Sequence, residues 1–264
     1  MPDKPNFVLV ADPEPAAEPV PVRRSAAAAP MRLPSIGHAL ATLRNTLFSR
    51  PEALPPVPPA AGPLRPRLVF GFDATASREP AWATARQVTD ALVQALPGAL
   101  DVALAVHGGS RLHTFTEFTA NPAALRDRAA SISCRSGSTQ MLPMLSRALG
   151  LPGVRVVTYI GDVFEESPGR GRQIADEMGR RGMRLIVLHD VADWSARRDA
   201  EIFLDLARRT GGCVLPFDAN APDRLRDLLA AVAVYAVGGK ALLWQQRATL
   251  PGAALLLQHL GPEN

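Results

Sequence analysis

Short apolar runs alternate with amphipathic segments from Arg67 onward, and this alternation constrains the fold more than any other feature of the sequence. The runs LVFGF, VVTYI and LIVL are almost wholly apolar, as is typical of parallel strands that are covered on both faces. Two of the segments between such runs, 82–96 and 139–149, have helical spacing, and we expect each to form one helix. The pattern predicts an α/β fold with a doubly wound, mostly parallel sheet and helices on both faces.

The proline distribution divides the chain into three parts. Fifteen of the 25 prolines lie in residues 1–66, which we expect to be a Pro/Ala-rich, mostly disordered arm. A short amphipathic helix is expected near 36–49, and it either docks on a partner or packs on its own domain. The α/β domain is assigned to 67–239. An apolar C-terminal extension, 240–264, is expected to dock onto the helices of the sheet or to contact a partner.

Composition argues against several classes of function. The net charge is only +4, and the arginines are spread along the chain among acids rather than gathered in a stripe, so no nucleic-acid partner is expected. The two cysteines are too few for a disulfide framework. The longest apolar stretch near the C-terminus, 228–239, is shorter than the roughly 20 residues of a membrane span. We therefore expect a cytoplasmic protein that does not bind membranes.

Oxygen-bearing side chains gather where ligands bind in open α/β sheets, beyond the carboxyl ends of the strands. Asp73 follows the first strand, Asp162 follows a later one, and hydroxyls lie nearby. Such hard oxygen donors suit Mg²⁺ or Mn²⁺ better than zinc or copper. The candidate metal ligands are Asp73, Thr75, Ser77, Thr139 and Asp162.

These residues resemble a known motif. D-x-T-x-S at 73–77, the threonine of SGST at 139 and the aspartate of YIGD at 162 are similar to the metal-ion-dependent adhesion site of von Willebrand factor A (vWA) domains, and to a bacterial, intracellular branch of that family. The resemblance implies a six-stranded, Rossmann-like sheet with one antiparallel edge strand, which we assign to 111–119. It also implies that the hydroxyls lie closest to the metal and that the two aspartates often reach it through water.

The function that follows is a metal-dependent protein–protein interaction module rather than an enzyme. Neutral hydroxyl ligands leave the metal electrophilic, so an Asp or Glu of a partner protein can complete its coordination. The resemblance adds AAA+ ATPases as candidate partners.

Two alternatives remain open. Asp73 could be the nucleophile of a haloacid-dehalogenase-like phosphatase or another hydrolase, although Thr75 stands where that class has a second aspartate and no lysine lies between Lys4 and Lys240. The protein could also be a scaffold whose metal site has lapsed. Arg78 adds a cation beside the site, which would repel a metal or pair with a partner's acid. Nearby, Glu165 and Glu166 either offset that charge or belong to a solvated loop.

Overall fold

The computed structural model describes residues 64–190, 194–218 and 220–261, which belong to one unit, Ala60–Asn264. Most of the predicted arm, including the helix near 36–49, lies outside the described residues, and the division of the chain at 66 and 239 stays a prediction.

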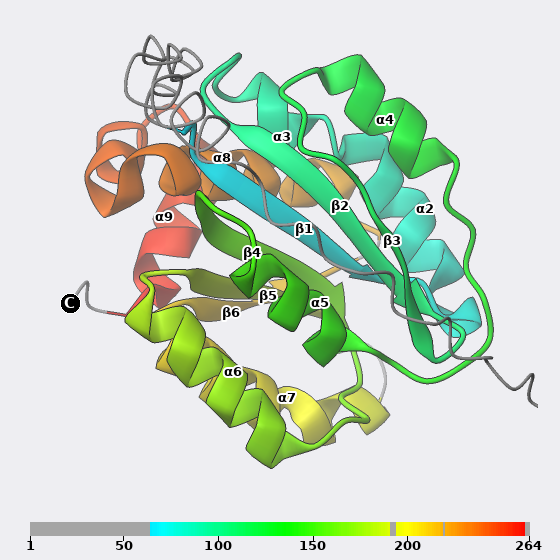
Figure 1. Cartoon of the computed structure of the whole chain (residues 1–264). Helices are drawn as coiled ribbons and strands as arrows, with labels where there is room; N and C mark the ends of the chain where they lie inside the picture. The colour runs from blue at the N-terminus through cyan, green and yellow to red at the C-terminus, as the bar shows by residue number, and fades with distance from the viewer. Residues whose placement is uncertain (1–63, 191–193, 219, 262–264) are drawn as a thin grey trace, which may run out of the picture. The chain divides into compact units, whose positions relative to one another are not determined.

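One six-stranded sheet forms the centre of this unit, with strand order β3-β2-β1-β4-β5-β6 (Figure 1). The edge strand β3 is antiparallel to β2, and the remaining neighbours are parallel, which confirms the predicted fold class. The strands are β1 (Arg67–Asp73), β2 (Asp101–Gly108), β3 (Arg111–Phe115), β4 (Val154–Gly161), β5 (Arg184–Asp190) and β6 (Cys213–Phe217).

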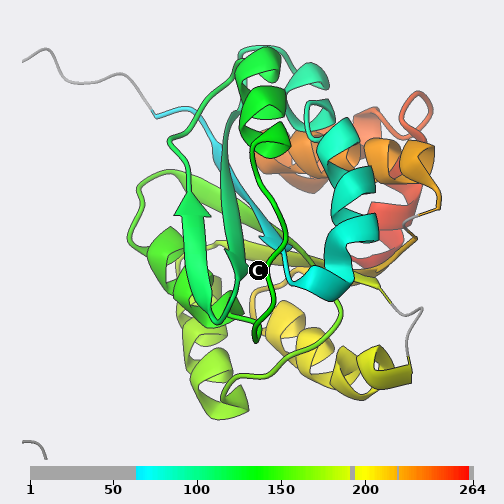
Figure 2. The same cartoon turned by 90° about the vertical axis from the view of Figure 1, so that its right-hand side faces the viewer.

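Helices cover both faces of the sheet (Figures 1 and 2). One buried cluster lies between the sheet and α2, α3, α4, α8 and α9, and a second lies between the opposite face and α5, α6 and α7. The helices are α2 (Glu79–Val88), α3 (Ala91–Gln94), α4 (Pro122–Ala130), α5 (Met141–Leu149), α6 (Pro168–Arg180), α7 (Trp194–Arg209), α8 (Pro222–Gln245) and α9 (Pro251–His259), with a 3₁₀ turn, η1 (Ala76–Arg78), before α2.

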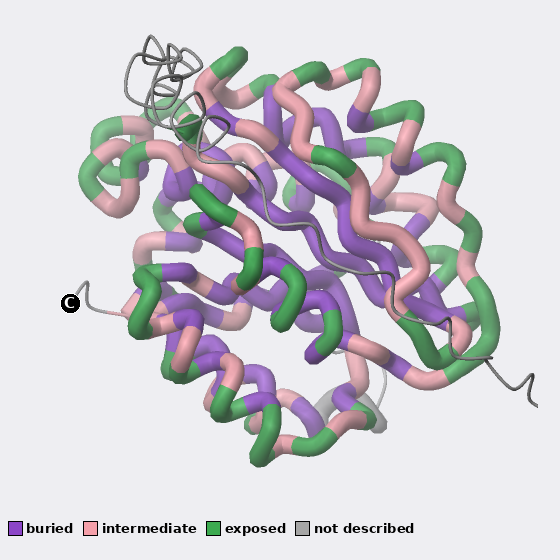
Figure 3. The backbone as a smooth tube through the Cα atoms, in the orientation of Figure 1, coloured by how far each residue is buried: buried purple, intermediate pink, exposed green. Residues whose placement is uncertain are grey.

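The central strand β1 is buried from Leu68 to Asp73 (Figure 3). Phe72 faces the first cluster and Val69 the second, in the alternation that a strand imposes. Gly71 leaves room for α5, because a Cβ at this position would collide with the thioether of Met144. The sheet therefore holds the end of β1 rigidly.

Two predicted elements differ from the structure. The single helix expected over 82–96 is broken into α2 and α3 around Thr89 and Asp90. The buried Asp90 carboxylate accepts hydrogen bonds from Gln94, one turn later, at 2.9 Å and from Arg126 on α4 at 2.7 Å, and this tertiary contact with Arg126 overrides the helical pattern.

The edge strand is shorter than the predicted 111–119. β3 ends at Phe115, and the next residue, Thr116, accepts the N–H of Leu104 through its side-chain hydroxyl at 3.0 Å. This side-chain bond replaces a backbone bond and ends the regular ladder.

The C-terminal extension docks on the domain. α8 continues past the predicted domain end with a kink at Gly239 (φ +63°), and α9 then packs back against α8 and β6. Leu243 and Leu256 are buried by this packing. Within the described part of the chain, α8 is the one helix long and apolar enough to cross a membrane, but half of that apolar window is buried in the domain, as is common for core helices.

Trp82 anchors α2 to the sheet and supports a stability prediction. Its ring lies 4.5 Å from that of Phe72, and its indole N–H donates to the carbonyl of Ile132 at 3.2 Å. We expect Trp82→Ala to lower the free energy of unfolding by about 3–5 kcal/mol in urea titrations. Trp244→Ala is the matched control, because Trp244 is 57% exposed, and it should cost less than about 1 kcal/mol. Equal losses would contradict this assignment.

Candidate metal centre

Asp73 ends the central strand and is almost completely buried, with 1% of its surface exposed. Its Oδ1 accepts the backbone N–H of Thr75 at 3.0 Å, in a turn that shapes the following loop. Its Oδ2 is also buried and has no hydrogen-bond partner among the described residues. A buried carboxylate oxygen without a donor is costly, so this atom marks a place where a cation would be stabilised.

The environment of Asp73 disfavours its charged form. Burial is the largest effect and raises the pKa of this carboxyl from 3.8 to about 7. The N–H of Thr75 and the charge of Arg78 act in the opposite direction, whereas the negative charge of Asp162 adds to the rise. Asp73 and Asp162 are therefore close enough for their charges to interact.

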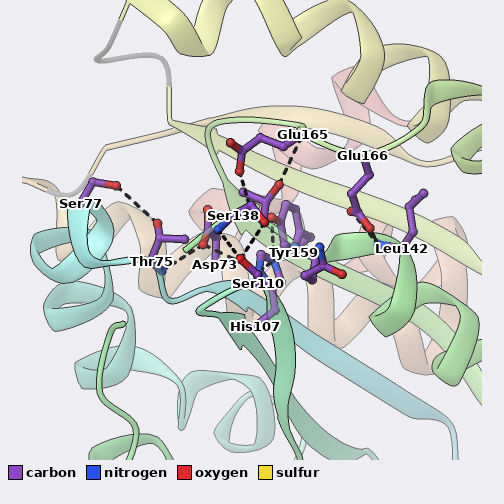
Figure 4. Close-up of polar contacts among 12 residues, drawn as sticks. Asp73, Thr75, Ser77, His107, Ser110, Ser138, Leu142, Tyr159, Glu165 and Glu166 are labelled. Carbon is purple, nitrogen blue, oxygen red and sulfur yellow. Dashed lines mark hydrogen bonds and ion pairs between the residues drawn. The ribbon is translucent and has the colours of Figure 1, made fainter. Parts of the chain in front are cut away.

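The two hydroxyls of the first motif lie together. The Oγ1 of Thr75 and the Oγ of Ser77 are 3.4 Å apart, and the η1 turn carries them past the end of β1 (Figure 4). Thr75 is buried and Ser77 is exposed, so this hydroxyl pair connects the buried carboxylate with the surface.

Thr139 lies in an irregular segment before α5, not at the start of the helix as predicted, because α5 begins at Met141. Its N–H donates to the Oε2 of Glu165 at 2.7 Å, and its Oγ1 accepts the N–H of Glu165 at 3.2 Å. This reciprocal pair fixes the threonine to the loop that follows β4.

Glu166 holds the start of α5. Both of its carboxylate oxygens accept the N–H of Leu142, at 3.1 and 2.9 Å, and a carboxylate is favoured at this positive end of a helix. Burial raises the pKa of Glu166, while the N–H groups of Leu142 and Met141 oppose the rise. Glu165 and Glu166 thus have structural roles that the sequence does not indicate, and Glu165 is an exposed loop residue whereas Glu166 is half-buried.

Three loops are tied together behind the candidate ligands. The N–H of Arg135 donates to the carbonyl of Ala74 at 2.8 Å, between Asp73 and Thr75. The N–H of Ser138 donates to the Oγ of Ser110 at 3.1 Å, and Gly137 (φ +144°) touches the backbone of Gly109 so closely that no side chain fits there. The segment that carries Thr139 is consequently fixed to the turn between β2 and β3.

His107 lies directly behind Asp73 and was not predicted to belong to the site. It is opposite Asp73 in the parallel pairing of β1 and β2, which is the signal that sequence reasoning could have used. Its Nδ1 accepts the N–H of Gln140 at 3.1 Å, so the proton is on Nε2, 3.0 Å from the hydroxyl of Tyr159. Burial lowers the pKa of His107 to about 3. The 3.8 Å approach of Nδ1 to Asp73 is therefore not an ion pair.

Arg78 pairs with Asp162 of its own chain. Its guanidinium nitrogen lies 3.4 Å from the Oδ2 of Asp162, and the two side chains are only 7% and 16% exposed. The sequence alone predicts that this arginine either repels a metal or pairs with an acidic residue of a partner. Because it already neutralises Asp162, Arg78 acts first as an internal counter-cation.

The structure links four of the five predicted residues. Asp73, Thr75 and Ser77 are joined by direct hydrogen bonds, and the charges of Asp162 and Asp73 interact. Thr139 is bonded instead to Glu165, in the loop after β4 that also carries Asp162. No group of three or more His, Cys, Asp or Glu side chains suited to a metal occurs in the described residues. A metal here would rest on two carboxylates and neutral hydroxyls.

Comparisons with known proteins bear on the fold. No family model matches the sequence, and no curated protein sequence matches it. Among solved structures, a von Willebrand factor type A protein from Catenulispora acidiphila is similar with a TM-score of 0.53 and 16% identity, over 64% of this chain and 43% of that one. Proximal thread matrix protein 1 from the mussel byssus gives a TM-score of 0.51 and 12% identity, over 64% of this chain and 46% of that one.

The same mussel protein, in a form with a zinc-occupied MIDAS motif, gives a TM-score of 0.50 at 12% identity, over 64% of this chain and 46% of that one. The chain spans less than half the length of each of these structures. At such identities the likeness concerns the fold alone, and it agrees with the strand order and the antiparallel edge strand described above. The described domain has a vWA-like, Rossmann-type fold.

Proposed function

We propose that this protein is a metal-dependent protein-binding module. The observation that carries the proposal is the Oδ2 of Asp73, at the carboxyl end of the central strand. This oxygen is buried and has no hydrogen-bond partner among the described residues. A divalent cation would supply the positive charge that this oxygen lacks. The donor set of two carboxylates and three hydroxyls suits Mg²⁺ or Mn²⁺. The ligands would be Asp73, Thr75, Ser77, Thr139 and Asp162.

Binding of a partner is the role that this donor set supports best. The metal, when bound, would offer a coordination position to an Asp or Glu of another protein. The chain's own residues would orient that acid. Ser77 is exposed beside the buried Thr75, so the site opens to the surface on this side. The zinc-occupied MIDAS of the mussel protein supports the proposal by analogy of fold. A cytoplasmic AAA+ ATPase is the partner class suggested by the sequence resemblance.

The phosphatase alternative gains little support. Asp73 would have to present a nucleophilic oxygen, yet its surface is only 1% exposed. The one lysine in the described residues, Lys240, donates to the carbonyl of Leu260 at the far end of α8. We therefore propose binding rather than catalysis.

The scaffold alternative has one observation in its favour, the Arg78–Asp162 ion pair. An internal guanidinium can neutralise a carboxylate that would otherwise hold a metal. Metal titrations of Thr139 and Arg78 variants separate a site that binds metal from one in which arginine has replaced the metal.

The first prediction about the candidate site concerns metal binding itself. We expect millimolar Mg²⁺ or Mn²⁺ to raise the Tm of the wild-type protein by several degrees, because a ligand that binds only the folded state stabilises it. Thr139→Ala should abolish the increment and Thr139→Ser should keep it, since serine retains the hydroxyl. Thr249→Ala, in the distant turn between α8 and α9, is the control.

Partner binding is tested in pull-downs with the wild-type protein and Asp73→Ala. A partner that is retained in Mg²⁺, released by EDTA and not retained by Asp73→Ala supports the proposal. A Tm that does not respond to either metal in the wild type and in all variants rules it out.

The second prediction uses the raised pKa of Asp73. The folded state keeps the proton of this carboxyl up to about pH 7, whereas the unfolded state releases it near 3.8. The contribution of this carboxyl to the free energy of unfolding of the metal-free protein should therefore be largest below about pH 3.8 and fall as the pH rises to about 7. Asp73→Asn should remove this fall and be more stable than wild type by about 1–3 kcal/mol at pH 8. Urea titrations in EDTA at pH 5 and pH 8 measure it, and identical pH dependence in both proteins would refute it.

The third prediction concerns Arg78. Replacing it by Gln removes a like charge beside the proposed metal and frees Asp162, so Mg²⁺ affinity should rise about tenfold in calorimetric titrations. Arg86→Gln is the control, because Arg86 is on α2 and its ion pair with Glu79 is outside the site. Unchanged affinity in Arg78→Gln would show that the guanidinium does not compete, and binding that exists only in this variant would favour the scaffold.

A further inference from the structure

A polar cavity lies beside the edge strand, and no candidate metal ligand belongs to its lining. Its volume is about 360 Å³, and it is bounded by β3, by the end of α4 and by the segment that follows α4. Four basic side chains line it, namely Arg111, His113, Arg128 and Arg135. No Asp or Glu belongs to the lining. The other polar lining residues carry hydroxyls and are Thr114, Thr116, Ser131 and Ser133.

The arginines of this cavity differ from several other arginines of the domain. Arg172, Arg181 and Arg209 pair with carboxylates on the helices. Within the described ranges, no carboxylate lies within 4.0 Å of Arg111 or Arg135, nor of Arg128, whose guanidinium donates to the backbone carbonyl of Glu117. Three like charges around one hollow repel each other, and an anion would remove that repulsion.

His113 reports the same field from inside the cavity. Its Nε2 is buried and has no hydrogen-bond partner in the described part of the chain. Burial lowers the pKa of this imidazole, and the positive charges of Arg135 and Arg111 lower it further. An anion in the cavity would offset the effect of the arginines on this ring.

We propose that this cavity is a binding site for a phosphate-type oxyanion, a role that does not rest on the proposed metal site. A tetrahedral dianion offers several acceptor oxygens, which matches guanidinium groups and hydroxyls that approach from β3 and from the segment after α4. A carboxylate offers two oxygens and one charge, and so would satisfy fewer of these donors. The source of the anion is either inorganic phosphate or a phosphorylated side chain of a protein.

The position of Arg135 makes this site relevant to partner binding. Its side chain lines the cavity, while its backbone N–H donates to Ala74, between two candidate metal ligands. One partner could therefore contact both sites at this end of the sheet.

The test is a titration of the full chain with inorganic phosphate, followed by NMR of the His113 ring. We expect saturable shifts and a rise in the pKa of His113. The double variant Arg111→Gln/Arg135→Gln should weaken phosphate binding at least tenfold, as the loss of charge-assisted bonds predicts. The matched double variant Arg170→Gln/Arg208→Gln, with the same change in charge on exposed positions of α6 and α7, should stay within about twofold of wild type.

Further arms separate the possible sources and the two proposals. A phosphoserine peptide that binds more tightly than inorganic phosphate identifies a protein-borne anion, and equal affinity identifies the small ion. Binding that persists in Asp73→Ala keeps this site distinct from the metal proposal. The inference is overturned if phosphate up to the order of 10 mM leaves His113 unchanged, if the Arg111/Arg135 variant binds like wild type, or if an unphosphorylated acidic peptide binds as well as the phosphorylated one.

Discussion

The buried carboxylate of Asp73 is the constraint around which this end of the sheet is organised. Its position is fixed by β1, which is covered on both faces, so the carboxylate cannot move into solvent without disturbing the core. One oxygen is satisfied by the turn at Thr75 and the other has no donor among the described residues. A fold selected for stability alone would not keep such a group, and unsatisfied polar atoms of this kind are expected at functional sites.

The surrounding residues stabilise the site without satisfying that oxygen. His107 is close to Asp73, but its Nδ1 accepts a hydrogen bond from Gln140 and cannot donate one to the carboxylate. Arg78 is a nearby cation whose charge lowers the pKa of Asp73, but its ion pair is with Asp162. Glu165 and Glu166 bind backbone N–H groups around the start of α5. The result is a set of interlinked loops in which Asp162 has an arginine partner, whereas the Oδ2 of Asp73 has no hydrogen-bond partner among the described residues.

The fold could be predicted from the sequence because parallel strands and their helices follow hydrophobic periodicity, which is a local signal. Asp73 and Asp162 could be placed at the same edge for the same reason. The break between α2 and α3 could not be predicted, because it depends on Asp90 meeting Arg126, 36 residues away. The pairing of Arg78 with Asp162 and of Thr139 with Glu165 is similarly non-local, and the sequence offered only alternatives for those charges. Electrostatic partners depend on distances that only the packed structure defines.

The two proposed sites have opposite electrostatic requirements, and the backbone joins them. At the end of β1, a cation would stabilise the buried carboxylate of Asp73, whereas an anion would stabilise the arginines beside β3. The segment Ser133–Arg135 contributes to the second site and, through the bond from Arg135 to Ala74, also fixes the turn of the first. A shift of this segment on anion binding would therefore move the loop between Asp73 and Thr75. Because binding free energies of linked sites are reciprocal, occupation of either site would then change the affinity of the other by the same factor.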